Sequence, residues 1–139
     1  FSFLSWGYFV PRFSKSVSDA VKLLRFGAPI NLIVLSIIIY LGPNAGAIHW
    51  AIFIVSSIFL SLTQPAVGMA FSLSNAGKAL TSFNLLIFIG AFSLQWIIGL
   101  IIDLGIGLNF SEINSFKFAM IFVLITSLSS YIYFLIKNK

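Results

Sequence analysis

Charged residues are rare along this chain, and they separate three long apolar stretches. Residues 26–77 run for 52 positions without a charged side chain, residues 79–102 for 24 and residues 118–136 for 19. A helix needs about 20 apolar residues to cross the roughly 30 Å hydrocarbon core of a bilayer. The first stretch is therefore long enough for two spans, and the turn-forming residues 42–46 (GPNAG) predict the break between them.

We place the spans at residues 23–41, 47–70, 79–102 and 117–136. They are expected to be helices, because an open sheet in lipid leaves backbone groups unpaired. The chain is 60% hydrophobic and 8% charged, with a mean hydropathy of +1.09, whereas a soluble domain carries about 25% charged residues. This composition excludes a soluble domain and a disordered chain. The predicted fold class is an all-α integral membrane protein in the lipid bilayer.

Basic residues predict how the spans are oriented. If the spans alternate in direction, one side of the membrane collects seven Lys and Arg residues and the other side only Lys117. Because basic residues gather on the cytoplasmic side, we expect the segment before the first span, the loop at Lys78 and the tail at 137–139 to be cytoplasmic. The net charge of +5 then reflects topology, and no nucleic-acid partner is expected. The expected location is the bacterial inner membrane.

The residues before the first predicted span fall into two parts. Residues 1–10 (FSFLSWGYFV) are apolar and would cover about 15 Å as a helix, half of a bilayer. We interpret them as the end of a truncated span, and the alternative is an interfacial anchor held by Trp6 and Tyr8. Residues 11–22 are basic with apolar positions at helical spacing, which predicts a cytoplasmic amphipathic loop on the membrane surface. A solvated connector is the alternative.

Residues with catalytic chemistry are few. The one histidine, His49, stands beside Trp50 at the beginning of the second predicted span, which is its outer end, where such a pair is typical of an interfacial anchor. The chain has no cysteine and no paired carboxylates, and its His and acidic residues are too few for a metal site. We therefore expect no enzymatic activity, no metal and no cofactor.

Polar residues inside the spans carry more information, because each needs a partner or an aqueous cavity. Asn84 and Gln95 are eleven residues apart, so they share one helix face and lie about 16 Å apart along the axis. Ala91 lies between them on that face, and Gly99 follows Gln95 by one turn. Such a stripe either lines a substrate path or seats a neighbouring helix closely.

The second predicted span contains Gln64 and Pro65, followed by the small residue Gly68. Pro65 removes one backbone donor and predicts a kink in the helix, with Gly68 as a hinge or packing position. Gln64 is a further candidate for a substrate path. Asn31 in the first span is another, and a structural hydrogen bond is its alternative role.

Two segments resemble a known family. Residues 77–103 (GKALTSFNLLIFIGAFSLQWIIGLIID) resemble the eleventh span of bacterial major facilitator superfamily transporters, in which a Gly-basic-Ala approach precedes a helix carrying Asn, Gly-Ala, Gln and Gly and ending in Asp. Residues 7–15 (GYFVPRFSK) resemble the cytoplasmic loop motif of that family through Gly7, Arg12 and Lys15. Pro11 stands where the family usually has Asp. The four spans would then be spans 9 to 12, and residues 1–10 the end of span 8.

The resemblance implies a bundle of twelve helices in two halves, with a substrate site near the midplane and alternating access by rocking of the halves. It makes Asn84 and Gln95 candidates for the cavity-facing stripe, and Gly90 and Gly99 candidates for close helix approach. We therefore expect the C-terminal fragment of a secondary active transporter for a small solute, whose partner is the missing N-terminal portion of the same transporter. The alternative is a small multi-pass accessory or scaffold protein that acts through helix–helix association.

Overall fold

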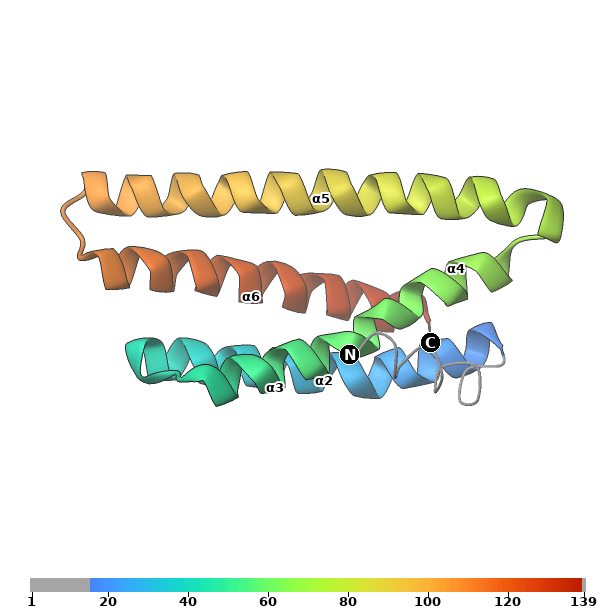
Figure 1. Cartoon of the computed structure of the whole chain (residues 1–139), viewed down its shortest axis with the longest axis horizontal. Coiled ribbons are helices and arrows are strands. Elements are labelled where there is room, and N and C mark those ends of the chain that lie inside the picture. Colours follow the sequence, from blue (N-terminus) through green and yellow to red (C-terminus); the bar gives the residue numbers. More distant parts are fainter. Residues whose placement is uncertain (1–15, 139) are drawn as a thin grey trace.

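The computed structural model describes residues 16–138, and within that range the chain is helical and has no strand. Four helical segments are long and apolar enough to cross a membrane, as the sequence predicts. They are Val17–Asn44, Ala47–Ala70, Leu73–Gly107 and Glu112–Lys137. Successive segments run in opposite directions along the bundle (Figure 1).

The first span, α2 (Val17–Leu41), begins six residues before its predicted start. Ser16 caps it, because the Ser16 hydroxyl accepts a hydrogen bond from the Asp19 N–H at 3.2 Å. The segment predicted as a separate loop at 11–22 is therefore, from residue 17 onward, the first turns of α2. Residues 1–15, including the predicted truncated span at 1–10, lie outside the described residues.

The predicted break at 42–46 is present. Gly42 ends α2 with a φ of 53°, a left-handed conformation that favours glycine, and its N–H donates to the carbonyl of Ile38. A short 3-10 helix, η1 (Gly42–Asn44), follows, and Gly46 precedes the next helix. The turn is compact enough to lay the second span back against the first.

The second span changes helix type along its length. It consists of α3 (Ala47–Ser57), the 3-10 helix η2 (Ile58–Leu62) and α4 (Thr63–Ala70). The tightened segment lies directly before Pro65, which has no N–H to donate and whose ring crowds the preceding turn. Figure 1 shows α4 leaving the line of α3 and rising towards the start of α5. The kink predicted at Pro65 is confirmed, although Pro29 leaves α2 a continuous α-helix.

The third and fourth spans extend beyond their predicted bounds. The third, α5 (Leu73–Gly107), has 35 residues and a length of about 52 Å. The fourth, α6 (Glu112–Lys137), starts at the N-cap Ser111 and has 26 residues. Helix α5 continues past Lys78 and Asp103, and α6 begins before Lys117, because helical hydrogen bonding does not stop where the hydrocarbon ends.

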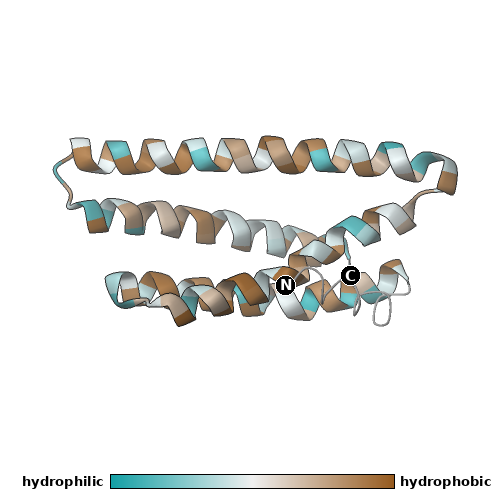
Figure 2. Cartoon of the chain, viewed as in Figure 1, coloured by the Kyte–Doolittle hydropathy of each residue, from teal (hydrophilic) through white to brown (hydrophobic). Residues whose placement is uncertain are grey.

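The central element of the packing is α6, which lies between α5 and α2 and contacts both (Figure 1). The second span joins the two sides, since α3 packs on α2 and α4 packs on both α2 and α5. Much of the outer surface is apolar, with Phe92 and Trp96 of α5 73% and 63% exposed. Figure 2 shows hydrophobic residues along all four spans. This surface suits contact with lipid or with further helices, because apolar side chains there need no water.

Close helix approach occurs at glycines other than those predicted. A Cβ added to Gly27 would lie 2.6 Å from Phe59 Cβ, and one added to Gly105 would lie 2.5 Å from Ser115 Oγ. Gly68 is in ordinary contact with Leu80 of α5, at 3.5 Å from its added Cβ. At Gly90 and Gly99 an added Cβ would meet nothing within 4 Å, so their predicted close approach is not made among residues 16–138.

The substitution Gly27→Ala tests the packing of α2 against η2. A methyl group at residue 27 forces the base of the Phe59 side chain to move, and we expect a loss of about 1–3 kcal/mol in the free energy of unfolding. The matched control is Gly90→Ala, which gives the same gain in helix propensity at an open position. Unfolding in detergent measures both, and equal stabilities of the two variants would contradict this packing.

Candidate functional site

An open cavity of about 450 Å³ lies between the spans, lined by residues of α2, η2, α4, α5 and α6. Its apolar wall includes Leu24 and Leu32 of α2, Leu60 of η2 and Leu94 of α5. Its polar wall consists of Asn31 of α2, Thr63 of α4 and four hydroxyl residues of α6, namely Thr126, Ser127, Ser130 and Tyr131. An apolar cavity with a few convergent polar groups is the usual form of a small-molecule site.

Helix α6 supplies most of the polar wall. Ser127, Ser130 and Tyr131 are spaced by three and four residues, which places them on one helix face. Helical serine hydroxyls commonly donate to the carbonyl four residues earlier, as Ser129 does to Ile125 at 2.8 Å. The hydroxyls of Ser127 and Ser130 make no hydrogen bond to any residue in 16–138. They are therefore available to a molecule in the cavity.

Asn31 is buried and fixed on one side by α3. Its Nδ2 donates to the hydroxyl oxygens of Ser56 and Ser57, each at 2.9 Å. Both hydroxyls donate their own protons to the Phe53 carbonyl at 2.8 Å, so they can only accept from Asn31. This arrangement fixes the amide orientation, and Asn31 Oδ1 accepts no hydrogen bond from the described residues. The oxygen is the atom of Asn31 that a bound molecule can use.

Two hydrogen bonds join α2 to α6 and its C-cap beside the cavity. The Tyr131 hydroxyl, which lines the cavity, donates to the Arg25 carbonyl at 2.7 Å. The Arg25 guanidinium donates through Nη2 to the Asn138 carbonyl, whereas its Nε is buried without a hydrogen-bond partner in the described range. Both contacts are hydrogen bonds between two spans, so they can be broken without disrupting either helix.

The other predicted path residues lie outside this cavity. Gln64 Nε2 donates to Asn84 Oδ1 at 3.1 Å, which joins α4 to α5 at an exposed position. Gln95 and Ala91 are also exposed on α5. Helix α5 turns Leu94 towards the cavity, and Gln95, the next residue, points about 100° away. Of the four path candidates, the structure therefore places only Asn31 in the cavity wall.

The remaining predicted residues have other positions. Pro65 and Gly68 belong to α4, where they set its direction and its contact with α5. Gly7, Arg12 and Lys15 of the loop motif lie outside the described residues.

The hydroxyl residues of α6 were not predicted as site residues. Their spacing at 126, 127, 130 and 131 was a usable signal, because it gathers hydroxyl groups on one side of a span. Thr63 in α4 carried no such signal, since a single threonine near a proline is also explained by a local hydrogen bond. Its hydroxyl does make one, to the Leu60 carbonyl at 2.8 Å.

The chemistry of the cavity is that of neutral hydrogen bonding. None of its lining residues is charged. Within residues 16–138 no group of three His, Cys, Asp or Glu side chains is placed to hold a metal ion. The available groups are two serine hydroxyls and one amide oxygen, set among leucine and phenylalanine side chains. They fit a small uncharged molecule with both polar and apolar surface.

Comparison of the chain with protein-family models, curated proteins and solved structures finds no match.

The Tyr131 contact leads to a paired test. Tyr131→Phe removes the hydrogen bond to the Arg25 carbonyl, and we expect a loss of about 0.6 kcal/mol in the free energy of unfolding, the average for such bonds in membranes. Tyr133→Phe is the matched control, because the Tyr133 ring is exposed and its hydroxyl takes no part in the hydrogen bonds between α2 and α6. Unfolding titrations in detergent measure the difference. A larger loss of unfolding free energy from Tyr133→Phe than from Tyr131→Phe would argue against the hydrogen bond between Tyr131 and the Arg25 carbonyl.

Proposed function

We propose that this chain forms part of a secondary transporter that moves a small uncharged solute across a membrane by alternating access. The observation that carries the proposal is the cavity between the four spans, where the free hydroxyls of Ser127 and Ser130 and the oxygen of Asn31 face one space. Binding groups at the interior of a helical bundle are typical of transporters, because the solute must leave water and be held within the membrane.

The hydrogen bonds at Arg25 join α2 to α6, and breaking them would let these two helices separate beside the cavity. One hydrogen bond contributes about 0.5–1.5 kcal/mol net, so separating Tyr131 from the Arg25 carbonyl lies within the range of thermal motion and of ligand binding. A solute that hydrogen-bonds Ser130 changes the surroundings of the adjacent Tyr131. In this mechanism Tyr131 is a positioning residue, because binding of the solute in the cavity alters the hydrogen bond that joins Tyr131 to the Arg25 carbonyl.

The resemblance of residues 77–103 and 7–15 to the major facilitator superfamily supports the same proposal. In that arrangement the four spans are spans 9 to 12, and further helices of the transporter cover the exposed face of α5. The exposed amide of Gln95 fits this view, because a polar side chain inside a membrane favours a protein partner or an aqueous path over lipid. The basic end of the bundle is then cytoplasmic.

A second candidate function rests on a different observation. Gly90 and Gly99 present open positions on α5, where another helix can approach closely. This favours an accessory or scaffold protein that acts by helix association. Cross-linking from a cysteine at Gly90 distinguishes the two functions: a defined homo-oligomer of this chain favours the scaffold.

The proposed topology predicts the sides of two loops. Since the chain has no cysteine, single cysteines can be placed at Lys78 and at Glu112, near opposite ends of the spans. A membrane-impermeant maleimide should label Lys78→Cys from the cytoplasmic side and Glu112→Cys from the opposite side. Labelling of both from one side would contradict the arrangement of four spans.

The transport proposal predicts that water reaches the cavity. Ser127→Cys should react with a membrane-impermeant maleimide, because its side chain faces the cavity. Ser129→Cys is the matched control on the same helix, outside the cavity lining, and should stay unlabelled because lipid excludes the reagent and disfavours the thiolate. If the Ser127 position is as unreactive as the Ser129 position in the folded protein, the cavity is not part of an aqueous path.

A further inference from the structure

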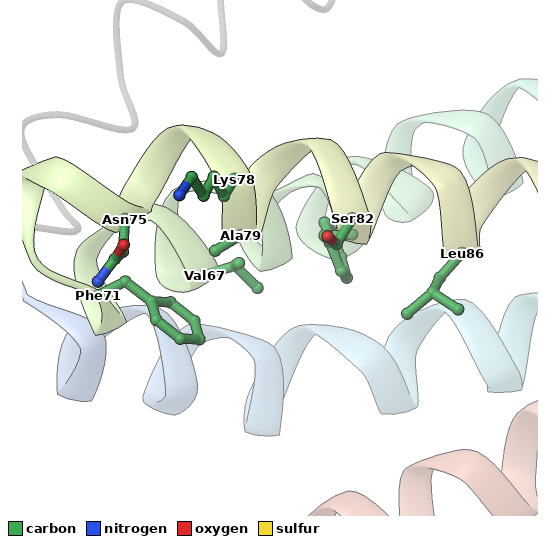
Figure 3. A pocket seen from close by; sticks show the side chains of 8 residues that line it. Val67, Phe71, Asn75, Lys78, Ala79, Ser82 and Leu86 are labelled. Atoms are coloured by element: carbon green, nitrogen blue, oxygen red, sulfur yellow. The ribbon is translucent and has the colours of Figure 1, made fainter.

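An open groove, of about 500 Å³, lies between α4 and the beginning of α5 (Figure 3). Its α5 wall includes Asn75, Lys78, Ser82 and Leu86, which follow helical spacing over about 16 Å. In Figure 3, Asn75 and Lys78 lie towards one end of the groove and Leu86 towards the other. The central cavity shares none of these residues.

The two ends of this groove differ in chemistry. Asn75 and Lys78 offer an amide and an ammonium group at the end where the Phe71 ring also lies, whereas Leu86 offers only hydrocarbon at the other end. Lys78 also marks the boundary of the uncharged stretch at 79–102, so its ammonium group is at the level expected for lipid headgroups. The apolar part of the groove extends from there into the hydrocarbon layer. The charged group of the lining therefore lies at one end of the groove.

No acidic side chain neutralises Lys78. The chain has three acidic residues. Asp103 lies about 37 Å from Lys78 along α5, and Glu112 begins α6 beyond it. Asp19 accepts a hydrogen bond from the Ser16 hydroxyl at 2.8 Å. Lys22, Arg25 and Lys137 lie at the same end of the bundle as Lys78 and outnumber Asp19 there, so this end has a net positive charge and attracts anions.

We propose that this groove is a binding site for an anionic phospholipid. The phosphate lies against the Lys78 ammonium and the Asn75 amide, and one acyl chain lies along Val67, Phe83 and Leu86. A lipid satisfies both ends of the groove at once, whereas a soluble phosphate would leave its apolar length uncovered. The bound lipid fills the gap between α4 and α5, and this role does not depend on the transport proposal.

Native mass spectrometry of the purified full chain tests the site, with phosphatidylglycerol and phosphatidylcholine of equal acyl chains as probes. The protein should retain phosphatidylglycerol in preference to phosphatidylcholine. Lys78→Gln should lower the retention of phosphatidylglycerol about fivefold, the factor expected for one lysine near an anionic surface. Lys137→Gln is the matched control, since Lys137 lies at the same end over the Tyr133 ring and outside the groove.

A second variant tests the apolar part of the groove. Ser82→Trp fills the space next to Phe83 and should lower the retention of both lipids, while thermal unfolding checks that the protein remains folded. Equal retention of the two lipids by the unaltered protein, or equal effects of Lys78→Gln and Lys137→Gln, would overturn the proposal. Competition by glycerol phosphate as strong as that by the whole lipid would also overturn it, because the groove would then hold a soluble anion.

Discussion

Inside a bilayer every backbone N–H and C=O group needs a partner within the protein, because lipid offers none. Pro65 makes this constraint acute in the second span, since it has no N–H to donate. Local hydrogen bonds compensate for this loss. Residues 58–62 form a 3-10 helix, the Ser61 hydroxyl donates to the Ile58 carbonyl, and the Thr63 hydroxyl donates to the Leu60 carbonyl. The resulting change of direction lets α3 pack on α2 while α4 reaches α5, and the central cavity lies beside this break.

Much of the fold could be predicted from the spacing of charged residues. Four spans, the turn at 42–46 and the kink at Pro65 follow from hydrophobic length and backbone chemistry, and the structure contains all three. The helix ends could not be predicted in the same way. Ser16 starts α2 within a basic segment, and α5 continues past Lys78 and Asp103, because capping and helical hydrogen bonds are independent of hydropathy.

The candidate site was less predictable, because one polar residue in a span has several physical explanations. Asn31 was singled out as a polar residue within a span, with a substrate path or a structural hydrogen bond as its possible roles. In the structure its amide donates to Ser56 of α3, and the residue also borders the cavity. Asn84 and Gln95 were predicted from helical geometry, which fixes the face they share but not the direction that face takes in the bundle. That direction depends on how α6 packs against α5, and the packing left both residues exposed.

The break in the second span also separates two sets of contacts between helices. Asn31 ties α2 to α3 through Ser56 and Ser57, and Gly27 seats η2 against α2. On the far side of the break, Gln64 bonds Asn84 and Gly68 contacts Leu80, which joins α4 to α5. Because α4 also packs on α2, and α6 packs on both α5 and α2, a rotation about residues 58–62 would have to separate α4 from α2 and to carry α6 along with α5.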